Sequence, residues 1–304
     1  MAYDRSYNAA KARRFHYLLQ ELMSLCNTIP DVRSHRGRPV EFPLPVLFVL
    51  LGLKFDARLG YRDFVAWLAL QPELLARLGL QRPPSHTLLN GALKRLDTRL
   101  LHRLYEVVAR KQPPPRRVAV DATGFSHATG GEWLSVRFKK TRKRRFHALH
   151  AAVDTESLLV HAARIRARPG GDAKHLVSLL RRVPGNELAT VYGDKAYISK
   201  KNAQFVTELG AYPAIEPKRN LRARSRGHRG YGRLLREYRA NPDKWKRTHQ
   251  YGQRSLAETV FSMLKVRFGG SLSSRGYKER RRELLIKVLL HNIQQVNFLE
   301  CAAR

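Results

Sequence analysis

The sequence has only two cysteines, Cys26 and Cys301, in 304 residues. They lie far apart, and no further Cys or His stands near either one at the spacing of a metal-binding motif. This scarcity excludes a disulfide framework and a zinc finger. We therefore expect the protein to work in a reducing compartment.

Long apolar runs are also missing. The longest uncharged one, residues 42–53, contains Pro43, Pro45 and Gly52 and is shorter than the roughly 20 residues of a membrane-spanning helix. The first 15 residues carry charges from the start and lack the apolar core of a signal peptide. We therefore expect a cytoplasmic protein. The many Ala, Arg and Leu residues are typical of a GC-rich prokaryotic genome. In a prokaryote we expect the protein to be associated with the nucleoid.

Acidic residues are few: 24 Asp and Glu stand against 58 Lys and Arg, a formal net charge of +34. Most metabolic enzymes are excluded by this charge, and nucleic acid becomes the favoured partner. Two runs concentrate the charge, residues 139–145 and 218–236. One basic run is usually a solvated face, whereas two runs in so basic a chain favour DNA or RNA binding. The candidate contacts in these runs are Lys139, Lys140, Arg142, Arg222 and Arg224.

The first third of the chain is predicted to be all-helical. Apolar residues recur at helical spacing over residues 8–25, 46–53, 62–70 and 72–78. Ser85 is a candidate N-cap for a further helix with Lys94 and Arg95 on its polar side. This unit is either a DNA-reading helix-turn-helix or part of a plain helical bundle, and the sequence favours neither.

A stiff proline-rich stretch, residues 112–117, predicts a domain boundary. We predict a helical domain over 1–112, a linker over 113–117 and an α/β domain over 118–300 with a basic insertion around 211–250. The predicted strands are 117–126, 132–138, 146–154, 159–167 and 188–197, and the predicted helices are 172–183, 199–209, 253–268 and 278–299. Residues 211–217 are predicted as a short strand or extended loop, and residues 220–233 as a loop.

Two aspartates follow predicted strands in an otherwise basic chain. Asp121 comes after Val118–Val120, and Asp194 comes after residues 190–193. Carboxylates at strand ends can converge at one edge of a sheet, where they would suit a hard cation such as Mg²⁺. Each aspartate alone is more often a turn former or a cap.

A third acid is predicted on a helix over residues 251–265. At about 100° per residue, Tyr251, Arg254, Glu258 and Lys265 would project from one stripe of that helix. The alternative interpretation is an ordinary exposed Arg254–Glu258 ion pair one turn apart.

These four residues match the Y-x2-R-x3-E-x6-K signature, and the chain resembles the DDE transposases of insertion sequences, in particular the superfamilies numbered four and five. The segments VDATGF and YGDKAY resemble the blocks with the first two acids of that family. The resemblance assigns Asp121, Asp194 and Glu258 as catalytic residues and metal ligands. It implies an RNase H-like fold with a mixed five-stranded sheet and two Mg²⁺ or Mn²⁺ ions.

The resemblance further implies a transposase that binds terminal inverted repeats as a homodimer, cleaves DNA and joins the freed 3′-OH to target DNA. It assigns phosphate or backbone contacts to Tyr251, Arg254 and Lys265, and a further phosphate contact to Lys195. Two alternatives stay open: an inactive relative that only binds DNA, and a structure-selective nuclease. Trp133 and Trp245 could stack on a displaced base, although a tryptophan is more often a core residue.

Overall fold

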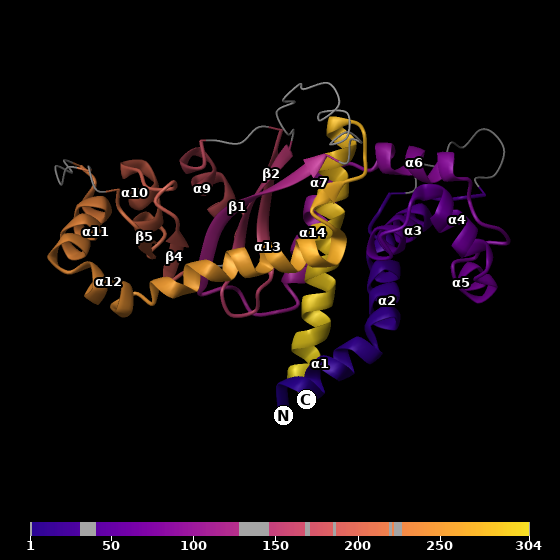
Figure 1. Cartoon of the computed structure of the whole chain (residues 1–304), viewed down its shortest axis with the longest axis horizontal. Coiled ribbons are helices and arrows are strands. Elements are labelled where there is room, and N and C mark those ends of the chain that lie inside the picture. The colour runs from indigo at the N-terminus through magenta and orange to yellow at the C-terminus, as the bar shows by residue number, and fades with distance from the viewer. Residues whose placement is uncertain are drawn as a thin grey trace, which may run out of the picture. The chain divides into compact units, whose positions relative to one another are not determined.

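The computed structural model describes residues 2–30, 41–127, 146–167, 171–184, 187–218, 221 and 227–303 (Figure 1). The chain folds into two compact units. Unit 1 consists of Met1–Val108, Arg267–Gly269 and Ser274–Arg304, and unit 2 consists of Ala109–Val266 and Gly270–Ser273. Unit 1 is therefore built from both ends of the sequence, with unit 2 between them.

Unit 1 is helical, as predicted for the first third of the chain. Its helices are α1 (Ala2–Ala12), α2 (Arg14–Cys26), α3 (Leu44–Asp56), α4 (Tyr61–Ala69), α5 (Pro72–Arg77), α6 (His86–Arg95), α7 (Thr98–Ala109) and α14 (Tyr277–Ala302). The predicted cap of α6 is confirmed, because the Ser85 hydroxyl accepts a hydrogen bond from the Leu88 N–H at 3.2 Å. Lys94 and Arg95 are exposed in the last turn of this helix.

The long apolar run of the sequence forms α3. Pro43 caps this helix and Pro45 lies in its first turn, where a missing N–H costs no hydrogen bond. Every residue from Leu47 to Phe55 is buried, so α3 is a core helix of unit 1. Among the described residues, no helix is both long enough and apolar enough to cross a bilayer.

The C-terminal helix α14 is a core element of unit 1, packed against α1, α2, α3 and α6. The side chains of Leu284, Leu289 and Ile293 are fully buried there. Asn292 and Asn297 donate hydrogen bonds to the backbone oxygens of Tyr105, at 3.2 Å, and Ala10, at 2.8 Å. The sequence analysis placed this segment in the domain 118–300; the structure groups it with unit 1, because helices distant in sequence bury it on all sides.

Unit 2 contains a mixed sheet in the order β3-β2-β1-β4-β5, with a short β6 beside β1. The strands are β1 (Arg117–His127), β2 (Phe146–Asp154), β3 (Val160–Arg166), β4 (Thr190–Gly193), β5 (Tyr212–Ile215) and β6 (Ser271–Leu272). β1, β2 and β3 are antiparallel neighbours, while β4, β5 and β6 pair in parallel. The predicted mixed sheet is confirmed, and residues 211–217 do contain a short strand. The predicted strand 132–138 lies outside the described residues.

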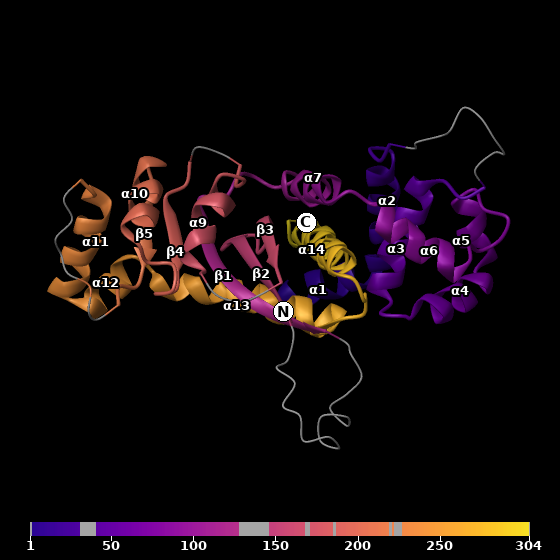
Figure 2. The same ribbon diagram turned by 90° about the horizontal axis from the view of Figure 1, so that it is seen from above.

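Helices cover both faces of this sheet (Figure 2). They are α9 (Ala173–Leu180), α10 (Lys200–Glu208), α11 (Arg229–Ala240), α12 (Pro242–Thr248), the 3₁₀ turn η1 (Tyr251–Arg254) and α13 (Ser255–Phe268). α9 and α10 lie on one face, and α13 runs across the other (Figures 1 and 2). The predicted helix 172–183 corresponds to α9, and 199–209 corresponds to α10.

The end of the predicted loop 220–233 is helical instead, since α11 begins at Arg229. Its buried residues Tyr231, Leu234 and Leu235 form an apolar face at helical spacing. Gly230 allows the close approach to α10, because a Cβ there would lie only 1.9 Å from the Thr207 Oγ1 atom. The glycine that suggested a loop is therefore required for helix packing.

Candidate active site

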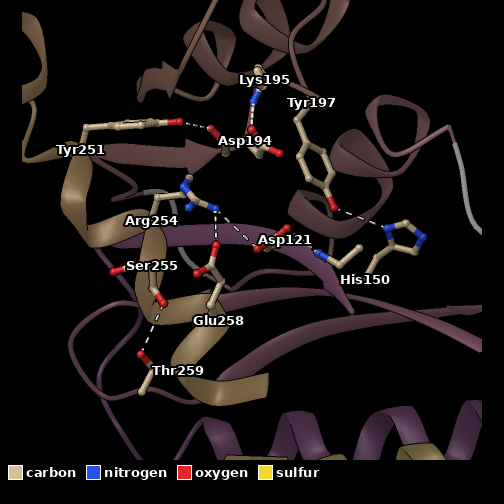
Figure 3. Close-up of polar contacts among 12 residues, drawn as sticks. Asp121, His150, Asp194, Lys195, Tyr197, Tyr251, Arg254, Ser255, Glu258 and Thr259 are labelled. Carbon is tan, nitrogen blue, oxygen red and sulfur yellow. Dashed lines mark hydrogen bonds and ion pairs between the residues drawn. The ribbon is translucent and has the colours of Figure 1, made fainter. Parts of the chain in front are cut away.

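The pairing of β1 with β4 brings Asp121 beside Asp194 (Figure 3). The two strands are parallel with Val120 opposite Gly193, so the aspartates occupy the next positions on neighbouring strands. Asp194 follows the end of β4, as predicted. Asp121 is not at a strand end, because β1 continues to His127 through its pairing with β2. Because β4 ends at Gly193, opposite Val120, Asp121 has no strand partner on the β4 side of β1.

Helix α13 contributes the third acid, Glu258, from its first turn. One nitrogen of Arg254, Nη1, lies 2.8 Å from Glu258 Oε1 and 3.6 Å from Asp121 Oδ2. Arg254 therefore connects the carboxylate on the helix to the carboxylate on the sheet (Figure 3). The ion pair of the alternative interpretation exists, but it is part of a larger group of charges.

Burial and neighbouring charge both act on Asp121. Burial raises the pKa of its carboxyl above the ordinary value, and the negative charges of Glu258 and Asp194 raise it further. The Ala122 N–H, 2.8 Å from Oδ1, and the Arg254 guanidinium act in the opposite direction. Three acids thus gather at one place, and the positive charge of Arg254 lies among them.

The donor chemistry of this site fits a divalent cation. Asp121, Asp194 and Glu258 offer carboxylate oxygens, the ligands that Mg²⁺ and Mn²⁺ prefer. Within the described part of the chain, no three acidic, His or Cys side chains stand in ligating geometry. At this site the Nη1 atom of Arg254 lies within 4 Å of a carboxylate oxygen of both Asp121, at 3.6 Å, and Glu258, at 2.8 Å. Ligation by all three acids requires this side chain to move.

The sequence predicted that Tyr251 shares one helical stripe with Arg254 and Glu258. This prediction is wrong, because Tyr251 does not belong to the α-helix. Gln250 has a left-handed backbone with φ of 49°, and residues 251–254 form the 3₁₀ turn η1 before α13 begins at Ser255. The tighter turn rotates Tyr251 away from the direction that an α-helix would give it. Its hydroxyl donates a hydrogen bond to the Gly193 carbonyl at 3.1 Å (Figure 3).

The remaining predicted contacts are distributed as follows. Lys195 is exposed directly after Asp194, and Lys265 lies two turns beyond Glu258 with Nζ 5.8 Å from the centre of the Phe125 ring. Lys94 and Arg95 belong to unit 1. The contacts expected in the two basic runs lie outside the described residues: Lys139, Lys140, Arg142, Arg222 and Arg224.

The base-stacking role of Trp245 is wrong, because this side chain is only 3% exposed. Its Nε1 donates to the Tyr212 hydroxyl at 2.8 Å, and its ring packs 5.2 Å from the ring of Tyr251. Trp245 is thus a core residue of the segment that precedes α13. Trp133 lies outside the described residues.

A buried polar group behind Asp121 was missed by the sequence analysis. His150 of β2 lies 3.4 Å from the Tyr197 hydroxyl and 3.8 Å from Asp172, and its ring is 4.4 Å from that of His175. Burial lowers the pKa of His150 to about 4, so its imidazole is neutral at pH 7. The signal was available: His147 and His150 interrupt the apolar residues of β2, and His161 follows the apolar start of β3.

A family model and a solved structure match this chain. The family model described as "Transposase DDE domain" matches residues 112–293, more than half of the 304-residue chain. A solved structure described as "Mos1 transposase paired-end complex with left transposon end" matches at 13% identity with a TM-score of 0.25, covering 90% of this chain and 81% of that one. The family match and the strand order of unit 2 confirm the predicted RNase H-like fold class.

Proposed function

Because the chain belongs to the family of transposases with a DDE domain, we propose that it is the transposase of an insertion sequence. It binds the terminal inverted repeats of its element, cleaves DNA there and transfers the cut strand to a target. The observation that carries this proposal is the grouping of Asp121, Asp194 and Glu258, three acids distant in sequence, in a chain with a net charge of +34.

The three carboxylates would hold the metal, as two Mg²⁺ or Mn²⁺ ions. Bound there, divalent ions stabilise the charge that develops on the attacking and leaving oxygens of a phosphodiester. Asp121 and Asp194 come from the rigid sheet, whereas Glu258 comes from the first turn of α13. Small movements of α13 would therefore adjust the distance of Glu258 from the other two acids.

The chemistry consists of two displacements at phosphorus. In the first, a water oxygen bonds to phosphorus and the bond to the 3′ oxygen breaks, which leaves a 3′-OH and a 5′-phosphate. In the second, this 3′-OH attacks a phosphodiester of the target and displaces a 3′ oxygen there. The second step makes one phosphodiester and breaks one, so it requires no ATP. The same carboxylates can serve both steps because both proceed through similar charge distributions.

Cations around the acids would bind the DNA. Lys195 directly follows Asp194, and Arg254 and Lys265 stand on either side of Glu258 in the sequence. These three cations would contact phosphates next to the cut. Lys94 and Arg95 on α6 would contribute from unit 1, together with the two basic runs. The protein would act as a homodimer, because two element ends must be held together, and it would work on nucleoid DNA in the cytoplasm of a prokaryote.

Cleavage of the gene's own flanking DNA tests the proposal. End-labelled duplexes with those flanks are incubated with the protein in Mg²⁺, Mn²⁺ or EDTA, beside the Asp194→Ala variant. We expect metal-dependent cuts at the boundary of a repeat, and labelled 3′ ends joined to other DNA. Tight, salt-sensitive binding without cleavage would indicate a DNA-binding relative instead, and cuts set by DNA structure rather than by a repeat would indicate a nuclease.

A further inference from the structure

The Tyr251 hydroxyl connects two strand ends at the proposed active site. It donates a hydrogen bond to the carbonyl of Gly193, the residue directly before Asp194, at 3.1 Å. The backbone of Glu216, just after β5, lies close enough to the same hydroxyl to lower its pKa, against the rise that burial causes. Gly193 and Ile215 are opposite each other in the β4–β5 pair, so the phenol closes the open end of this pair.

We propose that Tyr251 is a positioning residue that fixes Asp194 for catalysis, and that it does not contact DNA. This inference rests on the proposed function, in which Asp194 is a metal ligand. It gives the first position of the Y-x2-R-x3-E-x6-K signature a role inside the protein.

Asp194 needs such support because of its place in the fold. β4 has only four residues and ends at Gly193, so Asp194 lies beyond the last ladder hydrogen bonds. On its other side the chain turns at once, with the Tyr197 N–H donating to the Asp194 carbonyl at 2.8 Å. Displacement of a catalytic group by about 1 Å can cost about 100-fold in rate. The hydrogen bond from Tyr251 restrains the one flank of Asp194 that the turn does not.

The ring of Tyr251 is itself held by the helices of the basic insertion. Trp245 of α12 packs against it, and Trp245 in turn donates to the Tyr212 hydroxyl of β5. Tyr212 donates to Glu237 of α11 at 2.5 Å, and its ring stacks on His249 at 3.8 Å and 6°. Trp245 is thus held in place against the ring of Tyr251. The insertion therefore supports the active site mechanically, in addition to any contact that its charges make with DNA.

The decisive variant is Tyr251→Phe, which keeps the ring packing and removes the hydroxyl. Tyr238→Phe is a matched control. Tyr238 packs on the same tryptophan at 5.2 Å and loses an equivalent hydrogen bond, 2.9 Å to Glu216 Oε1, but it does not touch the backbone next to Asp194. Any general loosening of the aromatic cluster would appear in both variants.

Three quantities are measured: Mn²⁺ affinity of the DNA-free protein by electron paramagnetic resonance, DNA affinity, and cleavage rate at saturating DNA. For Tyr251→Phe we expect Mn²⁺ affinity to fall about 10-fold or more, as for groups that orient a metal ligand. The cleavage rate falls with it, while DNA affinity stays within about twofold. Tyr238→Phe matches the wild type in all three. Weaker DNA binding with an unchanged rate at saturation would overturn the proposal and restore the DNA contact.

Hydrogen exchange makes the test independent of metal. In Tyr251→Phe, the amides of residues 193–197 should exchange about fivefold faster, the effect of losing one hydrogen bond. Unchanged exchange there would overturn the positioning role. The proposed function is tested separately. If Tyr251→Phe shows faster exchange but the wild type binds no Mn²⁺, or if Asp194→Ala binds Mn²⁺ as well as the wild type does, the proposed function is refuted. The structural role of Tyr251 would then still stand.

Discussion

Each unit contains an acid–base pair one helical turn apart, and the two pairs are used in opposite ways. In unit 1, Lys287 Nζ lies 3.0 Å from Glu283 Oε1 and the two side chains are 4% and 1% exposed. In unit 2, Arg254 Nη1 lies 2.8 Å from Glu258 Oε1, with side chains 24% and 55% exposed. Both pairs are spaced four residues apart, with the acid first in unit 1 and the base first in unit 2, and they differ strongly in burial.

Burial decides what each pair can do. Glu283 also accepts a hydrogen bond from the Ser274 N–H at 2.8 Å, and the buried ammonium of Lys54 lies nearby over the rings of Phe55 and Tyr61. Because both side chains are almost fully buried, removal of either partner would leave an unpaired buried charge, which is strongly destabilising. Glu258 is half exposed and can exchange Arg254 for another cation at little cost. An exchangeable pair is what a metal site requires.

The largest effect is expected from the acids of unit 2. Asp121→Ala, Asp194→Ala and Glu258→Ala should each abolish cleavage and retain DNA binding, because they remove metal ligands and not phosphate contacts. Gel assays of cleavage and binding on the same labelled duplex check this. Asp243→Ala, which removes an exposed acid of α12, is the control and should cut normally. Normal cleavage by one of the three variants would remove its residue from the site.

The next effect concerns the stability of the fold, and here the larger effect is expected in unit 1. Glu283→Ala should lower the free energy of unfolding by about 3–5 kcal/mol, because it leaves buried lysines without their acid. Glu258→Ala should change it by about 1 kcal/mol or less. Urea titrations followed by circular dichroism measure both. Equal effects of the two variants would contradict the contrast between the units, and Glu283→Gln would separate lost charge from lost volume.

In unit 1, a pH effect on stability is expected from Lys54. Burial lowers the pKa of Lys54 to about 8 from 10.5, while Glu283 opposes this shift and Lys287 adds to it. Below about pH 8 Lys54 is protonated in both the folded and the unfolded chain, and the free-energy cost of burying its charge is present in full. Between about 8 and 10.5 the unfolded chain binds more protons, so stability rises with pH, by about 1–3 kcal/mol. Thermal unfolding of Lys54→Met should lack this rise, and an identical rise would contradict it.

The smallest expected effect tests whether Arg254 competes with a metal ion for the carboxylates. Arg254→Gln should raise the Mn²⁺ affinity of the DNA-free protein by about fivefold at most, the value of a partly exposed ion pair. The same variant should bind DNA more weakly, with a shallower salt dependence. Lys265→Gln, which removes a cation two turns away, should lack the gain in Mn²⁺ affinity. Unchanged or weaker Mn²⁺ binding by Arg254→Gln would show that Arg254 does not compete for the carboxylates.

The sequence predicted the three acids but not how they meet. Signature spacing identified Glu258, and apolar runs identified the strand that contains Asp121 and the strand that Asp194 follows. The register that makes the aspartates neighbours depends on a parallel pairing between segments about 70 residues apart, which no local pattern encodes. The 3₁₀ turn was missed for a similar reason: it depends on the left-handed Gln250, a residue type without a strong preference for that conformation.

Long-range packing explains the other differences. α14 has apolar residues on all sides, which indicates burial but not the unit in which it is buried. The first part of α11, residues 229–233, was predicted as the end of a loop because arginine and glycine dominate residues 220–233. Tyr231 nevertheless lies at helical spacing from Leu234 and Leu235, which follow that stretch. Its helix depends on α10, a partner that composition does not show. Elements that carry their own pattern were thus predictable, and those defined by a partner were not.

The return of α14 to unit 1 sets the order of events during synthesis. The ribosome releases the chain from its N-terminus, and compact units fold as they emerge. Unit 2 is complete once residue 273 has appeared, whereas the first 108 residues must wait for residues 274–304 to fill their core. The unit with the three acids of the proposed active site is therefore finished first. A message truncated shortly after codon 273 would yield that unit folded beside an N-terminal region without its central helix.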